Sequence, residues 1–231
     1  MIRLNDVNVL AETAAGPGRT ILDRVNLELA ERRVAVIGAN GSGKSTLLRL
    51  LNGLILPSSG RVEVDGLDTR TDARAVRRRV GFVFTDPLAQ LVMSTPADDI
   101  ELSLRRILPK RAQRRAHALA LLAERGLERL ADQSIYSLSG GERQLVALTS
   151  VLAAGPAILV ADEPTTLLDL RNRNLVRRAF DGLEQQLVYA THDLEHAAQA
   201  ERVLVVDEGR VFVDGEPQAS IAAYRALMGA A

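Results

Sequence analysis

Hydrophobic residues along the chain fall into short runs and alternating segments that predict a series of β-strands. Three of the runs, at 34–37, 158–161 and 187–190, are apolar at every position. Strands of this kind are buried on both faces, as in a parallel sheet covered by helices, so we predict an α/β fold. Glu208-Gly209 predicts a hairpin turn between the last two strands. The predicted strands are 2–10, 21–29, 34–37, 61–65, 80–84, 157–162, 187–191, 202–207 and 210–214.

The pattern changes in the middle of the chain. Early segments alternate polar and apolar residues with few helices between them, which predicts a small antiparallel sheet beside the parallel one. After residue 86 helical spacing replaces the strand pattern. The chain is therefore predicted to be one domain, with 1–86 and 147–231 as an α/β core with an antiparallel β subdomain and 87–146 as an inserted helical subdomain. The predicted helices include 96–105, 113–125, 127–131 and 218–228.

Charge and composition exclude several classes of protein. The 29 basic and 29 acidic residues cancel, so the chain has no overall field for a nucleic-acid backbone, and we expect no nucleic-acid partner. The absence of cysteine excludes disulfides, thiol catalysis and cysteine-ligated zinc. The longest uncharged stretch, 144–161, approaches the length of a membrane span, but Gly155-Pro156 divides it into a helix and a strand. With no signal peptide at 1–10, we expect a soluble protein without a transmembrane segment.

The basic residues are almost all arginines. Only two of the 29 are lysines, Lys44 and Lys110. The arginine-rich runs 77–79 and 110–115 are interpreted as solvated helix faces, with contact to a partner as the alternative. Lys110 has no evident role and is expected on the surface, whereas Lys44 lies inside a recognisable motif.

That motif, Gly-Ala-Asn-Gly-Ser-Gly-Lys-Ser at 38–45, follows the buried strand 34–37 and precedes a helix. It matches the pattern G-x-x-x-x-G-K-[ST] in the strand-loop-helix context that the pattern requires. Backbone N–H groups of such a loop surround phosphate oxygens, and the helix N-terminus adds its partial positive charge. We therefore expect Lys44 to reach the β- and γ-phosphates of a nucleotide, and the Ser45 hydroxyl to bind Mg²⁺. A kinase, a GTPase and an ATPase all remain compatible with this motif.

Two further strands end in polar residues that could act on the phosphates. Asp162-Glu163 ends one buried strand, and Thr191-His192-Asp193 follows another. Asp162 suits a partner of Mg²⁺, and Glu163 can position or deprotonate an attacking water. His192 can contact the γ-phosphate. Structural roles stay open for both segments, because a strand can end in a polar turn and Asp193 can cap a helix.

Leu138-Ser139-Gly140-Gly141-Glu142 lies between the phosphate loop (38–45) and the two acids. Together these motifs resemble the nucleotide-binding subunits of ABC transporters over about residues 1–215. The resemblance implies a RecA-like P-loop NTPase core, with ATP and Mg²⁺ bound between two protomers packed head to tail. The signature segment (139–142) also fits a helix capping box, so a structural role exists for it as well.

The resemblance assigns a role to each motif. The implied catalytic residues are Glu163, His192 and Lys44. The residues implied at the metal are Ser45, Asp162 and Thr85. Asp169 is placed in a loop that crosses the dimer interface, and Ser139 and Gly141 are placed against the γ-phosphate of the partner's ATP. The implied nucleotide contacts are Gly38, Asn40, Gly41, Ser42, Gly43, Lys44, Ser45, Thr46, Ser139, Gly141 and Asp169.

Glu142 stands where the family often has a glutamine, which is a mild departure from the family pattern, and two departures are larger. Thr85 stands where the family has a glutamine that touches Mg²⁺, and its shorter side chain implies a bridging water. Gln90, five residues later, is not assigned the missing role. The family also has an aromatic residue before the phosphate loop that stacks on adenine, whereas the first aromatic residue here is Phe82. Arg19, through its guanidinium plane, or Leu10, through apolar contact, is expected in its place.

The docking segment (85–93), followed by Asp98-Asp99-Ile100, is similar to the docking region of ATPases in energy-coupling-factor vitamin and metal-ion importers, and most similar to the biotin-type subunit. We expect Leu91, Val92 and Met93 to be exposed for docking, with ordinary core as the alternative.

The resemblance implies an ATP-hydrolysing subunit at the cytoplasmic face of the membrane. Its partners would be a transmembrane coupling subunit, a substrate-binding membrane subunit, and a second copy or another ABC ATPase. Two alternatives are kept. One is a soluble ABC-type ATPase in DNA repair or translation, and the other is a nucleotide-gated binding module that does not hydrolyse.

Overall fold

The computed structural model describes residues 1–11 and 18–229. Within them the strands form two sheets, one antiparallel and one mainly parallel. The antiparallel sheet, ordered β2-β1-β4-β5, contains β1 (Ile2–Leu10), β2 (Thr20–Leu29), β4 (Ser59–Val64) and β5 (Leu67–Asp68). The second sheet, ordered β10-β9-β3-β8-β7-β6, contains β3 (Arg33–Ile37), β6 (Val80–Val83), β7 (Ile158–Asp162), β8 (Gln186–Ala190), β9 (Arg202–Asp207) and β10 (Arg210–Gly215).

The second sheet confirms the predicted α/β fold. Strands β6, β7, β8, β3 and β9 run parallel, and β10 returns antiparallel to β9 through the predicted hairpin turn at Glu208-Gly209. The interior strand β7 is buried at every position, and β3 and β8 are buried at all but their first residue. Continuous apolar runs of this kind mark strands covered on both faces.

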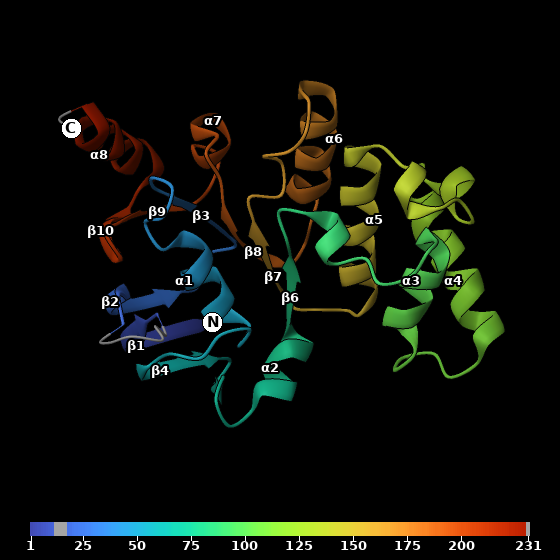
Figure 1. Ribbon diagram of the computed structural model, residues 1–231, viewed down its shortest axis with the longest axis horizontal. Coiled ribbons are helices and arrows are strands. Elements are labelled where there is room, and N and C mark those ends of the chain that lie inside the picture. The colour runs from blue at the N-terminus through green and yellow to red at the C-terminus, as the bar shows by residue number, and fades with distance from the viewer. Residues whose placement is uncertain (12–17, 230–231) are drawn as a thin grey trace.

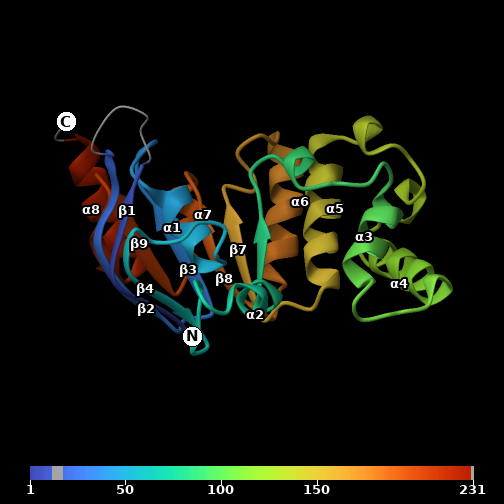
Figure 2. The ribbon, with the colours of Figure 1, turned by 60° about the horizontal axis from the view of Figure 1, so that its bottom comes forward.

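The helices are distributed along the length of the molecule. In Figures 1 and 2 the antiparallel sheet and α8 lie at one end, α3 and α4 at the other, and α5 and α6 beside β6 and β7. The helices are α1 (Lys44–Leu51), α2 (Ala73–Arg79), α3 (Pro96–Leu104), α4 (Arg111–Ala123), α5 (Gly140–Ala153), α6 (Leu170–Asp181), α7 (Leu194–Ala197) and α8 (Pro217–Gly229), with short 3₁₀ turns η1 (Pro87–Ala89), η2 (Glu128–Leu130) and η3 (Ile135–Ser137).

Two hydrophobic clusters lie on opposite faces of the parallel sheet. Alternate residues of β3 show the division, because Val34 and Val36 join one cluster whereas Ala35 and Ile37 join the other. The first cluster packs the sheet against α1 and the antiparallel sheet, and the second packs it against α3, α4, α5 and α6. Each fully buried leucine of α1, such as Leu48, contributes about 1.5–3 kcal/mol to folding.

Some elements differ from the sequence-based expectation. The segment 127–131 forms only the short turn η2, because the chain leaves α4 through Gly126, whose φ of +68° suits the end of a helix, and too few residues follow to start a new helix. Helix α5 is continuous across residue 146, where the sequence places the return to the core. The exposed arginines at 77–79 belong to α2, which agrees with their interpretation as a solvated helix face.

The expected exposure of Leu91 is wrong. Its side chain is only 7% exposed and packs into the cluster that covers α3 and α5. Val92 is 77% exposed, and Met93 is half-buried. Hydrophobicity alone does not specify which of three consecutive apolar residues faces the core, and in this irregular segment only Leu91 is fully buried.

None of the helices in the described part of the chain combines the length and the apolar character that crossing a bilayer needs.

Candidate nucleotide-binding site

The phosphate loop joins β3 to α1 and leaves the N-terminus of α1 open. Gly43 precedes the helix with a φ of +111°, and no side chain caps the first-turn N–H groups, which also carry no acidic neighbour in that turn. A Cβ at Gly43 would lie 2.9 Å from the Leu22 side chain, and one at Gly38 would lie 2.1 Å from the Val206 carbonyl oxygen. Glycine is therefore required at both positions, and the uncapped helix start fits an anion.

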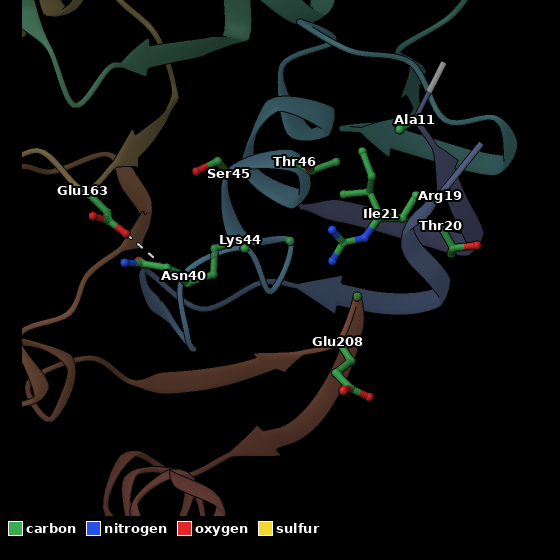
Figure 3. Close-up of a pocket in the computed structure, with 13 residues that line it drawn as sticks. Ala11, Arg19, Thr20, Ile21, Asn40, Lys44, Ser45, Thr46, Glu163 and Glu208 are labelled. Carbon is green, nitrogen blue, oxygen red and sulfur yellow. Dashed lines mark ion pairs between the residues drawn. The ribbon is translucent and has the colours of Figure 1, made fainter. Parts of the chain in front are cut away.

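The phosphate loop opens into a cavity of about 560 Å³. Figure 3 shows Lys44, Ser45 and Thr46 on one side of it, Glu163 at one end, and Arg19, Thr20 and Ile21 toward the other. Gly38 and Ser42 do not line this cavity, although both were predicted to contact the nucleotide. The lining residues are Ala11, Arg19, Thr20, Ile21, Asn40, Gly41, Gly43, Lys44, Ser45, Thr46, Glu163, Glu208 and Gly209.

Lys44 is held inside the loop. Its Nζ donates to the carbonyl oxygens of Gly38 and Ala39, each at 2.9 Å, and the residue is 5% exposed. Burial lowers the pKa of the Lys44 ammonium, against the opposing effect of Glu163 and Asp162. The distance from Nζ to Glu163 Oε1 is 3.8 Å, longer than a hydrogen bond. One of the three N–H donors of Lys44 is thus free to meet a phosphate oxygen.

The predicted metal-site residues are linked by hydrogen bonds. Ser45 Oγ donates to Asp162 Oδ1 at 2.9 Å, and Thr85 Oγ1 donates to the Asp162 carbonyl oxygen at 2.6 Å. Burial raises the pKa of Asp162, and the bond from Ser45 partly offsets this. A hydroxyl and one carboxylate are the protein donors that Mg²⁺ commonly uses beside phosphate and water. The described residues hold no group of three or more histidine or acidic side chains that could bind a metal without such additional ligands.

Glu163 and His192 meet at the ends of the neighbouring strands β7 and β8. His192 Nε2 lies 2.6 Å from Glu163 Oε1, and Thr166 Oγ1 donates to Glu163 Oε2 at 3.0 Å. The backbone of Glu163 has a φ of +49°, which is rare for a residue other than glycine and costs about 1–3 kcal/mol. Lys44 and Glu163 thus line one end of the cavity, whereas His192 lines a separate cavity of about 520 Å³ and reaches the site through its contact with Glu163.

The residues at the other end of the cavity were only partly predicted. Arg19 lines the cavity as expected, whereas Leu10 lines a neighbouring cavity of about 510 Å³. Ile21 was not predicted, and neither was Gly209, whose N–H donates to the Ser42 carbonyl oxygen at 2.9 Å. These two residues reach the site through the packing of β2 and the β9–β10 hairpin, and no local motif marks them.

Gln90 is engaged away from the metal-site residues. Its Oε1 accepts from the Phe84 N–H and its Nε2 donates to the Ala147 carbonyl oxygen, both at 3.2 Å. Both ends of the amide are thus used, so Gln90 does not take the place of the glutamine absent at Thr85.

Ser139, Gly141 and Asp169 lie outside this cavity. Ser139 caps α5, and Asp169 caps α6 by accepting from the Asn172 N–H at 2.8 Å and from its side-chain amide at 2.9 Å. A Cβ at Gly141 would lie 2.4 Å from Asn172 Oδ1, so the two helix starts pack closely. The structure therefore brings these three predicted residues together, but apart from the phosphate loop of the same chain.

The predicted capping box is present at Ser139 and Glu142. Glu142 Oε2 lies 2.9 Å from the Ser139 N–H and 2.8 Å from its Oγ, which donate to it. These bonds hold the pKa of Glu142 below its ordinary value of 4.5.

Glu142→Gln is expected to lower the unfolding free energy at pH 7 by about 0.5 kcal/mol, because glutamine keeps the box without the charge-assisted bond. For a carboxylate with a lowered pKa this contribution is full above pH 4.5 and disappears as the pH falls through the folded-state pKa. Urea unfolding of both proteins at pH 7 and below pH 4 measures the difference. An equal difference at both pH values would contradict the prediction.

Comparison with known proteins identifies the family of the chain. The ABC transporter family model matches residues 22–166. The chain is 46% identical over 209 residues to the biotin transport ATP-binding protein BioM of Rhizobium etli, covering 90% of this chain and 93% of that protein. It is 42% identical over 211 residues to the energy-coupling factor transporter ATP-binding protein EcfA1 of Symbiobacterium thermophilum, covering 88% of this chain and 74% of that protein.

Solved structures share the fold. The ATP-binding cassette MJ0796, in a dimeric post-hydrolysis state bound to ADP and Pi, superposes with a TM-score of 0.84 at 30% identity, over 94% of this chain and 99% of that one. The protein cbiO1 from Clostridium perfringens, part of the ABC transporter complex cbiONQ, gives a TM-score of 0.81 at 28% identity, over 99% and 93%. The chain therefore belongs to the ABC transporter family, as one of its ATP-binding, ATP-hydrolysing subunits.

Proposed function

We propose that this protein is the energy-coupling ATPase of a membrane importer of the energy-coupling-factor type. The observation that carries the proposal is the meeting of Lys44, Glu163 and His192 beside the open N-terminus of α1. A site that only bound nucleotide would not need a carboxylate held by a histidine and a threonine at the mouth of the phosphate loop. The names of the relatives, a biotin transporter and an energy-coupling factor, support the importer class.

In the proposed reaction the phosphate loop and Lys44 bind the β- and γ-phosphates of ATP. Glu163 orients a water molecule and accepts its proton as the water oxygen attacks the γ-phosphorus and the bond to the β-phosphate oxygen breaks. His192, which contacts Glu163, would contact the γ-phosphate. Mg²⁺ bound by Ser45 and Asp162, with Thr85 acting through a water, would neutralise charge on the β- and γ-phosphates.

The proposed functional unit is a dimer of ABC ATPase chains packed head to tail. Each site would then receive the partner's Ser139 and Gly141 at the γ-phosphate, and Asp169 would lie near the interface. This arrangement accounts for the separation of these three residues from the phosphate loop of their own chain. The dimeric state of the solved cassette bound to ADP and Pi supports it.

The proposed contact with the membrane subunits is the docking segment, at the cytoplasmic face of the membrane. Leu88 and Val92 are its large exposed apolar side chains. The buried carboxylate of Asp99 accepts from the N–H groups of Val92 at 2.8 Å and Met93 at 3.0 Å, and from Ser150 Oγ at 2.7 Å. Hydrogen bonds to Asp99 therefore link the docking segment to α3 and to α5, the helix that begins at the signature segment. Biotin is the proposed substrate, and it would bind to a membrane subunit.

Val92→Asp is expected to reduce recovery of membrane partners at least tenfold, because it places a charge at an exposed apolar contact. The test is purification of the tagged protein in mild detergent from cells that carry its gene, with the bound membrane proteins identified. Phe212→Asp, at an exposed apolar position on β10, is the control for added charge. Recovery of nucleic acid instead of membrane proteins would favour a repair or translation ATPase and contradict the proposal.

A further inference from the structure

An exposed tyrosine lies directly before the signature segment. Tyr136 is 74% exposed, the highest fraction among the four phenylalanines and three tyrosines of the chain. Large aromatic side chains usually stabilise a protein by being buried. An exposed one beside the signature segment is therefore a candidate for binding a ligand or partner.

The backbone that carries Tyr136 is fixed. The turn η3 begins at Ser134, whose carbonyl oxygen accepts from the Ser137 N–H at 3.0 Å and from its hydroxyl at 2.7 Å. The neighbours on both sides, Ile135 and Leu138, are 3% and 4% exposed. Tyr136 is therefore held at a constant position relative to the first turn of α5, while its ring contacts solvent.

The surface around the first turn of α5 carries further exposed apolar side chains. Leu167 and Leu170, which flank Asp169, are 68% and 63% exposed. They belong to the segment that packs on this turn, because a Cβ at Gly140 would lie 3.1 Å from the Leu168 side chain. A second copy of the chain packed on this face would cover these side chains.

Among the described residues, those that line the nucleotide cavity include no aromatic side chain for the base. No aromatic residue precedes Phe82 in the sequence, and the end of the cavity distant from Glu163 is lined by Ala11, Arg19, Thr20 and Ile21. These side chains offer one guanidinium plane and aliphatic contacts, which can cover one face of a planar base. The opposite face of the base is left for a residue outside this set.

We infer that Tyr136 of one protomer stacks on the nucleobase bound by the other, opposite Arg19 and Ile21. The inference rests on the proposed head-to-tail dimer, in which the partner's Ser139 faces the γ-phosphate. The three residues from Tyr136 to Ser139 span at most about 10 Å, so the ring lies within the length of an extended nucleoside triphosphate. Stacking depends on the area of the base and not on its hydrogen-bonding pattern. A purine has the larger ring system, so the ligand class is a purine nucleoside triphosphate.

The first test uses the dimer that Glu163→Gln is expected to accumulate. With the additional change Tyr136→Ala, the ATP concentration for half-maximal dimerisation is expected to rise about tenfold, whereas Tyr136→Phe keeps the aromatic face and the wild-type value. Inorganic tripolyphosphate, which has no base, should dimerise all three proteins equally. An unchanged ATP requirement in Tyr136→Ala, or an equal rise with tripolyphosphate, would overturn the inference.

The second test uses the absence of tryptophan from the chain. Tyr136→Trp in the Glu163→Gln protein introduces a single fluorescent reporter, whose emission should be quenched when ATP forms the dimer. Phe212→Trp, at an exposed position on β10, is the matched control and should change little. A dimer of the Tyr136→Trp protein whose indole emission stays unchanged would overturn the inference alone. A protein that binds ATP but stays monomeric would overturn the proposed dimer, and the inference with it.

Discussion

Glu163→Gln is expected to lower the rate of ATP hydrolysis by about a hundredfold to ten-thousandfold while ATP binding is retained. Glutamine has nearly the shape of glutamate. Its amide oxygen can accept from His192 Nε2, which lies 2.6 Å from Glu163 Oε1, and its NH2 group can donate to Thr166 Oγ1, which lies 3.0 Å from Glu163 Oε2. It cannot take a proton from water. The phosphate contacts of Lys44 and the N-terminus of α1 are unaffected, so nucleotide should accumulate in its unhydrolysed form.

Phosphate release and equilibrium binding of ATP measure the two halves of this prediction separately. Glu184→Gln, an exposed position in the connection between α6 and β8, is the matched control for the loss of one carboxylate. Its turnover should equal that of the unmodified protein. Turnover of Glu163→Gln within tenfold of the unmodified protein would remove Glu163 from the role of base, and loss of ATP binding would show that it has a structural role in the loop.

Much of the site could be predicted because its geometry is local or follows from sheet topology. Gly43 has to adopt a φ of +111° ahead of α1, so the motif itself specifies the loop. Glu163 and His192 follow the carboxyl ends of strands β7 and β8, which are parallel neighbours. Residues at such strand ends meet at one edge of the sheet, where open α/β folds place their ligands.

The end of the cavity distant from Glu163, where the nucleobase would bind, could not be predicted in the same way. Ile21 and Gly209 are separated from the phosphate loop in sequence and reach it through the packing of β2 and of the β9–β10 hairpin, where the Asp23 N–H donates to the Gly209 carbonyl oxygen at 2.9 Å. Arg19 and Leu10 were both candidates in the sequence, and the packing of the folded chain places only Arg19 in this cavity. Leu91 was misplaced for a related reason, because hydrophobicity does not specify which residues of an irregular segment face the core.

Lys44→Arg is expected to reduce kcat/KM for ATP by at least about a hundredfold although the charge is kept. The Lys44 ammonium occupies a space bounded by the carbonyl oxygens of Gly38 and Ala39, both 2.9 Å away, and the residue is 5% exposed. A guanidinium is larger and planar, and its donors point in fixed directions. It cannot enter this space without displacing the loop that binds the phosphates.

Lys110→Arg is the matched control, because Lys110 is the second of only two lysines in the chain and is exposed ahead of α4. Its kcat/KM should be unchanged. If Lys44→Arg also kept full activity, a positive charge alone would satisfy the site and the fit of the ammonium inside the loop would be irrelevant. Loss at Lys44 alone would explain why a chain with 29 basic residues uses lysine at this position. The loop requires a compact cation with rotatable donors, and arginine cannot supply one.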